Sequence, residues 1–115
     1  MLKTNDDLEG ALKTYLLLLD KEEYFDAHEV LEEAWHPLRL ADHPLKNLVK
    51  GLINGAIAFE HLKRNSNDAE KKAKKVMVSF DKYRHLCTEK IEYFEVFEKA
   101  CQKIEALKIQ YEKVF

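Results

Sequence analysis

The segment YFDAHEVLEEAWHPLR, residues 24–39, carries the pattern that decides the fold of this chain. Apolar residues recur in it at intervals of three and four, which is the spacing of one face of an α-helix. Pro37 disfavours helical geometry at the residue before it, so we expect this helix to end at Trp35 or a little beyond. The segment therefore predicts an amphipathic helix that begins at Tyr24.

The segments on either side show the same helical period. We expect further helices over residues 5–20, 45–65 and 68–86, and from Thr88 to the C-terminus. Residues 45–65 are apolar around most of their circumference, which is typical of the central helix of a bundle. Within them Gly51 and Gly55, one turn apart, predict the close approach of a neighbouring helix. The sequence thus predicts an all-α fold: one domain, residues 1–115, built as a bundle of about five helices with short connections.

Local signals place the starts of three of these helices. Pro44 suits the first turn of the third helix, where its missing N–H costs nothing. Asn67 and Glu70 have the spacing of a capping box for the fourth helix. Thr88, followed by Glu89, suits the start of the fifth.

Composition excludes some classes of function. A formal net charge of −2 over 115 residues argues against a general nucleic-acid binder, which needs a basic excess. No apolar run approaches the roughly 20 residues that span a bilayer, and the N-terminus lacks the apolar region of a signal peptide. We therefore expect a cytoplasmic protein without a membrane segment. In that compartment Cys87 and Cys101 are expected to be small core residues rather than a disulfide.

The last helix carries an apolar stripe of approximately heptad spacing. This stripe comprises Phe94, Phe97, Cys101, Ile104, Tyr111 and Phe115. At this length it is expected to pack on the same domain or on a second copy of the chain, so a homodimer through the C-terminal helix is one predicted assembly.

The second helix holds the one cluster of side chains suited to binding or catalysis. Successive helical residues turn by about 100°, which places His28 and Glu32 inside the apolar arc, while Glu29 and Glu33 fall outside it. Residues at i and i+4 can meet on one helix face. An ionisable pair within a buried stripe must be paired, because desolvation of a lone charge is costly.

The third helix has a complementary feature. One narrow polar stripe breaks its apolar surface, formed by Asn47, Lys50, Asn54 and His61. Because the helix is otherwise apolar enough to be central, this stripe is expected to face the His28 and Glu32 side of the preceding helix. The prediction is a polar pocket shared by two helices.

Three interpretations of this pocket stay open at this point. It can be a buried hydrogen-bond network with a structural role. It can be a metal site in which His28, Glu32 and His61 are three ligands and a fourth position is open, a set suited to zinc or to non-haem iron or manganese. It can also be a metal-free site for a small polar ligand, with Glu32 or His28 as proton carrier and Lys50 or Arg39 as anion contact.

Two strings of residues resemble a known family. The string Y-F-D-A-H-E-V-L-E-E-A-W, followed by L-V-K-G-L-I-N-G-A-I-A-F-E-H-L-K-R-N, is similar to the small prokaryotic helical proteins of domain-of-unknown-function family 309 over about residues 22–80. The resemblance implies an all-α bundle, and it implies the characteristic positions His28, Glu29, Glu32, Trp35, Gly51 and His61. Asn54 stands where many members have Gln, which keeps the amide but shortens its reach.

The resemblance brings no established activity, so no enzyme class follows from it. The expectation is a small helical protein whose pocket between the second and third helices binds a metal or a small polar ligand, with hydrolysis as a candidate chemistry. The alternative is a structural or protein-interaction module in which the His/Glu cluster is a buried hydrogen-bond network.

Overall fold

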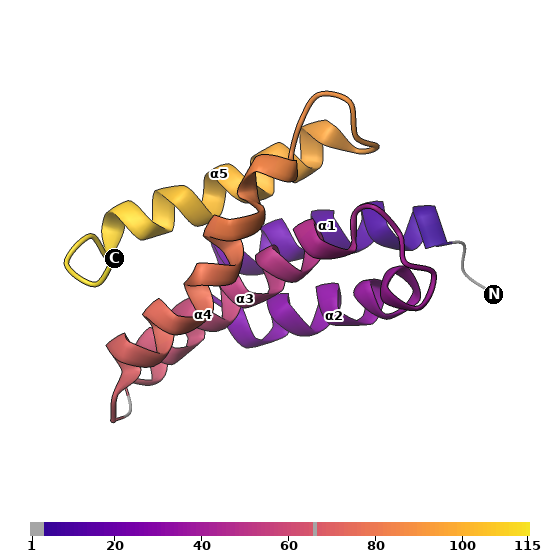
Figure 1. Ribbon diagram of the computed structural model, residues 1–115. Helices are drawn as coiled ribbons and strands as arrows, with labels where there is room; N and C mark the ends of the chain where they lie inside the picture. The colour runs from indigo at the N-terminus through magenta and orange to yellow at the C-terminus, as the bar shows by residue number, and fades with distance from the viewer. Residues whose placement is uncertain (1–3, 66) are drawn as a thin grey trace.

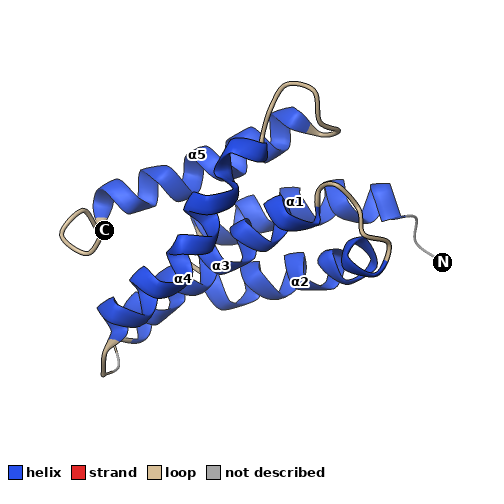
Figure 2. Cartoon of the chain, in the orientation of Figure 1, coloured by secondary structure: helices blue, strands red, loops and turns tan. Residues whose placement is uncertain are grey.

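A computed structural model describes residues 4–65 and 67–115 of the chain, with side chains from Leu8 onward. Helices and their connections make up this whole part of the chain, without a strand (Figure 2). The elements are α1 (Thr4–Asp20), α2 (Tyr24–Leu40), α3 (Lys46–Arg64), α4 (Ala69–Tyr83), the short 3₁₀-helix η1 (Arg84–Leu86) and α5 (Phe94–Gln110). The predicted all-α bundle is confirmed.

The third helix, α3, is the centre of the bundle. It contacts α2, α4 and α5, whereas α2 packs against α1 and α3. In Figure 1, α5 lies on one side of α1 and α3, and α2 lies on the other. The buried residues of α3 are Leu48, Val49, Gly51, Leu52, Ile53, Gly55, Ala56, Ala58 and Phe59. The predicted central position of this helix is therefore confirmed, and α2 and α3 lie side by side as the shared pocket requires.

Two glycines of α3 allow its neighbours to approach closely. A Cβ atom at Gly51 would lie 3.3 Å from the Cα atom of Phe80 and 3.3 Å from the carbonyl oxygen of Ser79, both in the α4 backbone. A Cβ atom at Gly55 would lie 3.2 Å from the side chain of Ile104 in α5. The predicted close helix packing is confirmed, and each glycine serves a different neighbour.

Replacement of Gly51 by alanine is therefore expected to destabilise the protein, although alanine is the better helix former. The new methyl group would press on backbone, which cannot rotate away, and such overpacking costs about 1–2 kcal/mol. The matched control is Gly10→Ala in α1, where a Cβ atom meets nothing within 4 Å. That change should raise the free energy of unfolding by up to about 1 kcal/mol. Urea unfolding of both variants checks the opposite signs, and equal effects would contradict the close approach.

The predicted end of the second helix near Trp35 is wrong, because α2 continues through Pro37 to Leu40. Proline removes one helical hydrogen bond, but the last turn has compensations. Leu38 is buried, and a Schellman motif closes the end: the N–H of Asp42, in the left-handed conformation (φ 52°), donates to Arg39, and the N–H of His43 donates to Leu38. These contacts outweigh the disfavoured geometry before the proline.

The predicted starts of α3 and α4 also differ from the structure. Pro44 lies in the turn before α3, where the backbone N–H of Leu45 donates to Nδ1 of His43 at 3.1 Å. At α4 the N-cap is Asp68, in the left-handed conformation (φ 62°) and without a side-chain capping bond. The capping box predicted at Asn67 is therefore wrong, because the turn places that residue one position too early.

The fifth helix begins at Phe94 rather than at Thr88. Thr88 forms a turn instead, in which its carbonyl oxygen accepts from the N–H of Ile91 and its hydroxyl accepts from the N–H of Lys90. Ile91 and Tyr93 of this connection pack against the core. The chain thus uses residues 87–93 to reverse direction, which a helix from Thr88 would not allow.

The apolar face of α5 packs within the same chain. Phe97, Cys101 and Ile104 are buried as predicted, and the helix contacts α1 and α3. The homodimer through this helix stays a prediction.

A half-buried arginine at the end of α4 also holds α5. The guanidinium of Arg84 donates to both carboxylate oxygens of Glu98 at 3.1 Å, and its Nε donates to Glu105 at 3.0 Å. These partners raise the pKa of Arg84 above its usual range, so the guanidinium stays charged. Three side chains therefore join the start of η1 to two positions of α5 that lie two turns apart.

Candidate functional site

His28 projects from α2 toward α3 with a defined tautomer. Its Nδ1 atom lies 2.5 Å from the carbonyl oxygen of Phe25. A carbonyl oxygen only accepts, so Nδ1 carries the hydrogen, and Nε2 is the ring nitrogen left to contact Glu32 or a ligand. Nε2 lies 3.8 Å from Oε2 of Glu32, and the His28 side chain is 15% exposed. The i, i+4 contact predicted between these two residues is present.

The helical wheel predicted that Glu32 is buried, and this prediction is wrong, because its side chain is 49% exposed. The buried face of α2 consists of Tyr24, Ala27, Leu31, Ala34 and Leu38. His28 and Glu32 lie at the margin of this buried face, on the side of α2 that is next to α3. Among the described residues no polar or charged residue is buried. The interpretation of the cluster as a buried hydrogen-bond network is therefore wrong, because the groups reach water.

A small pocket between α2 and α3 receives both histidines. Its volume is about 190 Å³. The lining residues are Phe25, His28, Ile57, Glu60, His61 and Arg64. One histidine thus comes from each helix, with Phe25 and Ile57 as apolar walls. The structure brings together His28 and His61, the two residues from different helices that were expected to share a pocket.

The charged rim of this pocket is an arginine held in place from two sides. Nε of Arg64 donates to Glu60 at 2.5 Å, one turn earlier in α3. Its guanidinium also lies 5.5 Å from the ring centroid of Phe25, a cation–π contact that links the two helices. Arg64 still has N–H donors beyond these contacts, because a guanidinium has five.

The electrostatic environment of His61 favours its neutral form. Partial burial lowers the pKa of this imidazole below its usual 6.5, and the positive charges of Lys72 and Arg64 lower it further, against a smaller opposing effect of Glu60. His61 is therefore neutral at neutral pH and can accept a proton. A ligand with a negative charge would reverse the effect of Lys72 and Arg64.

Removal of the charge of Lys72 is expected to raise the pKa of His61. In Lys72→Gln the imidazole should titrate closer to 6.5, whereas Lys74→Gln, an exposed neighbour in α4, should leave it unchanged. Because the folded-state pKa lies below the unfolded value, the native protein loses stability as the pH falls below about 6.5. Lys72→Gln should reduce that loss. NMR titration of the histidine rings and urea unfolding between pH 5 and 7 check both effects, and equal shifts in the two variants would contradict the assignment.

A second pocket, of about 180 Å³, shares His28 with the first. Its lining residues are His28, Glu29, Glu32, Glu33 and His36, all in α2. Within the described part of the chain, no group of three or more His, Cys, Asp or Glu side chains is arranged to hold a metal ion. The metal set of His28, Glu32 and His61 therefore gains no geometric support and stays a prediction.

The remaining predicted residues do not line the histidine pocket. Lys50 Nζ lies 4.5 Å from the ring centroid of Trp35, and the guanidinium of Arg39 lies 5.3 Å from the same centroid. The two cations predicted as anion contacts thus flank the half-buried indole instead of lining the histidine pocket. Asn54 is half-buried in α3.

Sequence reasoning missed four of the residues that line the histidine pocket. These are Phe25, Ile57, Glu60 and Arg64. A signal for two of them was present: Ile57 and Arg64 stand four residues before and three residues after His61, on the same face of α3. Arg64 was overlooked because it falls in the last turn of the helix.

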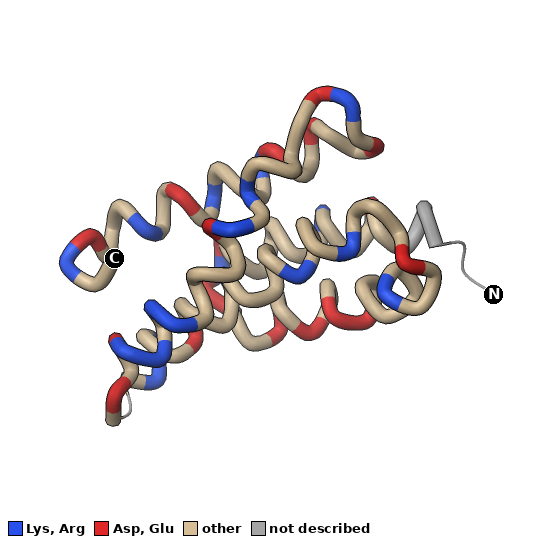
Figure 3. Tube along the Cα trace, viewed as in Figure 1, with Lys and Arg blue, Asp and Glu red and all other residues tan. Residues whose placement is uncertain are grey.

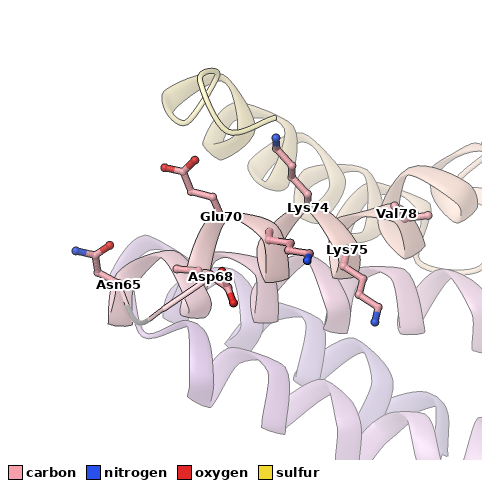
Figure 4. A pocket seen from close by; sticks show the side chains of 8 residues that line it. Asn65, Asp68, Glu70, Lys74, Lys75 and Val78 are labelled. Atoms are coloured by element: carbon pink, nitrogen blue, oxygen red, sulfur yellow. The ribbon is translucent and has the colours of Figure 1, made fainter.

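A larger hollow on the surface lies elsewhere, beside the first turns of α4. It has a volume of about 880 Å³, and its lining includes Asn65, Glu70, Lys71, Lys74 and Lys75. Figure 4 shows the labelled lysines Lys74 and Lys75 extending away from the helix. All five of these side chains are exposed, which is typical of a solvated charged face. Despite its volume, this hollow is therefore lined by exposed charged side chains, whereas apolar walls and histidines converge in the pocket between α2 and α3.

Charge is distributed unevenly around the groove. Figure 3 shows acidic residues along α2 and a concentration of basic residues where α3 meets α4. Glu29 and Glu33 belong to the acidic side, whereas Arg64 and Lys72 belong to the basic side. The histidine pocket lies at the boundary between them.

Comparison with known proteins identifies a family. The chain matches the model of the family described as Domain of unknown function (DUF309) over residues 12–72. The chain therefore belongs to this family, as its sequence strings indicated. No curated protein and no solved structure matches it. The matched residues contain all of α2 and α3 and hence both pockets, whereas η1 and α5 lie outside the match. Within the described residues, no helix is both long and apolar enough to cross a membrane.

Proposed function

We propose that the pocket between α2 and α3 binds a small organic anion, with His28 and His61 as its proton-accepting groups. One observation carries the proposal: a single pocket of about 190 Å³ receives a histidine from each of two helices together with the Arg64 guanidinium. Convergent polar groups beside apolar walls are typical of ligand sites. The pocket also lies within the part of the chain that matches the family model.

The charges around the pocket support a negatively charged ligand. Burial lowers the pKa of His61 most, and Lys72 and Arg64 lower it further against the smaller opposing effect of Glu60, so the net effect of these charges at the imidazole favours an anion. Arg64 provides the planar donor geometry that suits a carboxylate or a phosphate. An anion beside His61 would be held by the guanidinium and, once the imidazole takes a proton, by a second charge.

The size and walls of the pocket limit the body of the ligand. Sites for drug-sized molecules have volumes of about 300–1,000 Å³, and this pocket is smaller. Phe25 and Ile57 offer contacts for a short apolar or aromatic portion. An aromatic monocarboxylate such as benzoate combines both features and is a suitable probe.

Isothermal titration calorimetry of the untagged protein with benzoate, inorganic phosphate and Zn²⁺ tests this proposal. We expect benzoate to bind, and His61→Ala to weaken it about tenfold or more, the equivalent of about 1.4 kcal/mol. The matched control is His85→Ala, an exposed histidine in η1 outside the pocket. It should leave the affinity unchanged.

The other outcomes of the same titrations distinguish the alternatives. Binding of Zn²⁺ that is lost in both His28→Ala and His61→Ala, without binding of benzoate, would replace the proposal with the metal site. An absence of binding by all three probes, or an equal loss in His61→Ala and His85→Ala, would contradict a small-ligand site. The protein-interaction module would then be the better hypothesis.

A further inference from the structure

The structure brings together two cysteines that stand apart in the sequence. Cys87 follows η1 at the beginning of the 87–93 connection, and Cys101 lies in the middle of α5. The Cys87 side chain contacts Glu98, which stands one turn before Cys101 on the same face of α5, so the two thiols lie close together. Both are free thiols; Cys101 is fully buried and Cys87 is half-buried. Two neighbouring thiols, one of which reaches the surface, can act as a pair rather than as two separate core residues.

The surroundings of this pair keep both sulfurs in place. Cys87 Sγ donates to Glu98 at 3.5 Å, and Glu98 is itself held by two hydrogen bonds from Arg84. Cys101 packs in the buried face of α5 beside Ile104 and Phe97. Cys87 is the C-cap of η1 and has extended backbone geometry (φ −80°, ψ 90°). The chain at Cys87 can therefore adjust toward Cys101 without disturbing a helix.

We propose that Cys87 and Cys101 form a reversible disulfide that fastens α5 to the end of η1 when the protein meets a low-molecular-weight disulfide. The thiolate of Cys87, the accessible sulfur, attacks the oxidant's S–S bond and releases one small thiol, which leaves a mixed disulfide on Cys87. The thiolate of Cys101 then attacks the Cys87 sulfur and releases the second small thiol. Two protein thiols are oxidised, the oxidant is reduced to two thiols, and the two protein protons are transferred to them.

The reduced pair is the resting state at neutral pH. Burial, together with the carboxylate of Glu98, raises the pKa of Cys87 to about 11, and burial raises the pKa of Cys101 as well. Thiolates are the reactive form, so exchange is slow until the oxidant accumulates. Disulfides in reducing compartments are mostly of this transient kind.

This device belongs to a part of the chain outside the family match. The match ends at residue 72, whereas both cysteines lie beyond it. The disulfide would add a covalent link to the helix that Arg84 already holds through Glu98 and Glu105. Its effect is therefore on the attachment of α5 and not on the histidine pocket.

Oxidised glutathione, added to the folded full-length chain, provides the test. Intact mass spectrometry should show the loss of two hydrogens, and proteolytic mapping should link the peptides of Cys87 and Cys101. The matched variant is Cys101→Ser, in which the first step occurs without the second, so a glutathione adduct should remain on Cys87. The melting temperature of the oxidised wild-type protein should exceed that of the reduced protein. Circular dichroism verifies that Cys101→Ser is folded. If Cys101→Ser does not fold, Cys87→Ser, which changes a half-buried position, replaces it as the test variant.

Three results would overturn the proposal. The wild-type chain could retain the glutathione adduct as Cys101→Ser does, which would show that the two sulfurs do not meet. It could form disulfides between chains. The folded chain could also stay unreacted, while a control sample unfolded in guanidinium chloride loses its two hydrogens in the same time. In Cys87→Ser, the buried Cys101 should take up no glutathione while the protein is folded.

Discussion

Replacement of Phe59 by alanine is expected to lower the free energy of unfolding by about 3–5 kcal/mol. Phe59 is fully buried in α3. Its ring centroid lies 5.7 Å from those of Tyr24 and Tyr111 and 5.8 Å from that of Phe115. One ring thus joins the start of α2 and the C-terminal residues to the central helix. Removal of the ring leaves a cavity that these neighbours cannot all fill.

The matched control is Phe25→Ala on α2. Phe25 is 44% exposed and forms a wall of the histidine pocket. Its truncation should cost less than about 1 kcal/mol, but it should weaken binding of benzoate. Urea unfolding and calorimetry of the two variants separate core from pocket. A large loss of stability in Phe25→Ala, or a small one in Phe59→Ala, would show that the buried face of the bundle is assigned incorrectly.

Replacement of Arg84 by methionine is expected to lower the free energy of unfolding by about 2–3 kcal/mol. Methionine keeps the apolar stem but leaves Glu98 and Glu105 without the guanidinium that they share. Arg84→Lys should restore little, because an ammonium group cannot bind two carboxylates in the same forked geometry. The amides of α5 should lose protection from hydrogen exchange more than those of α2.

Arg64→Met is the control for this arginine. The Arg64 side chain is 61% exposed and forms one i, i+4 pair with Glu60, so its loss should change stability by less than about 0.5 kcal/mol. Equal effects of Arg64→Met and Arg84→Met in urea unfolding would mean that the Arg84 cluster does not hold α5.

Hydrophobic periodicity was sufficient to predict the number of helices and their order. The apolar circumference of residues 45–65 identified the central helix, and Gly51 and Gly55 predicted the close packing that the structure shows. These features follow from local spacing, which the sequence displays directly. Helix ends were harder, because they depend on residues that become neighbours only when the chain turns.

Two helix boundaries illustrate this limit. Pro37 predicted an early end of α2, but burial of Leu38 and a left-handed Asp42 carry the helix farther. Thr88 has the composition of a cap, yet it forms a turn, because Ile91 and Tyr93 pack against the core. Each local signal was outweighed by a tertiary contact that propensity does not contain.

The candidate site was predicted in part for a similar reason. The helical wheel found the facing positions of His28 and His61, which depend on the period alone. It placed Glu32 too deep, because a wheel gives direction but not the distance to the next helix. The approach of Cys87 to Cys101 could not be predicted, since it depends on how the 87–93 connection turns the chain back.

The most direct test of the histidine pocket is NMR observation of the imidazole rings during titration with benzoate. We predict that the ring signals of His28 and His61 shift together and saturate, and that the pKa of His61 rises as the bound anion offsets Lys72 and Arg64. The signals of His85, an exposed residue in η1, should stay in place. If His28 and His61 do not respond, or if His85 shifts equally, the two histidines do not form one anion-binding pocket.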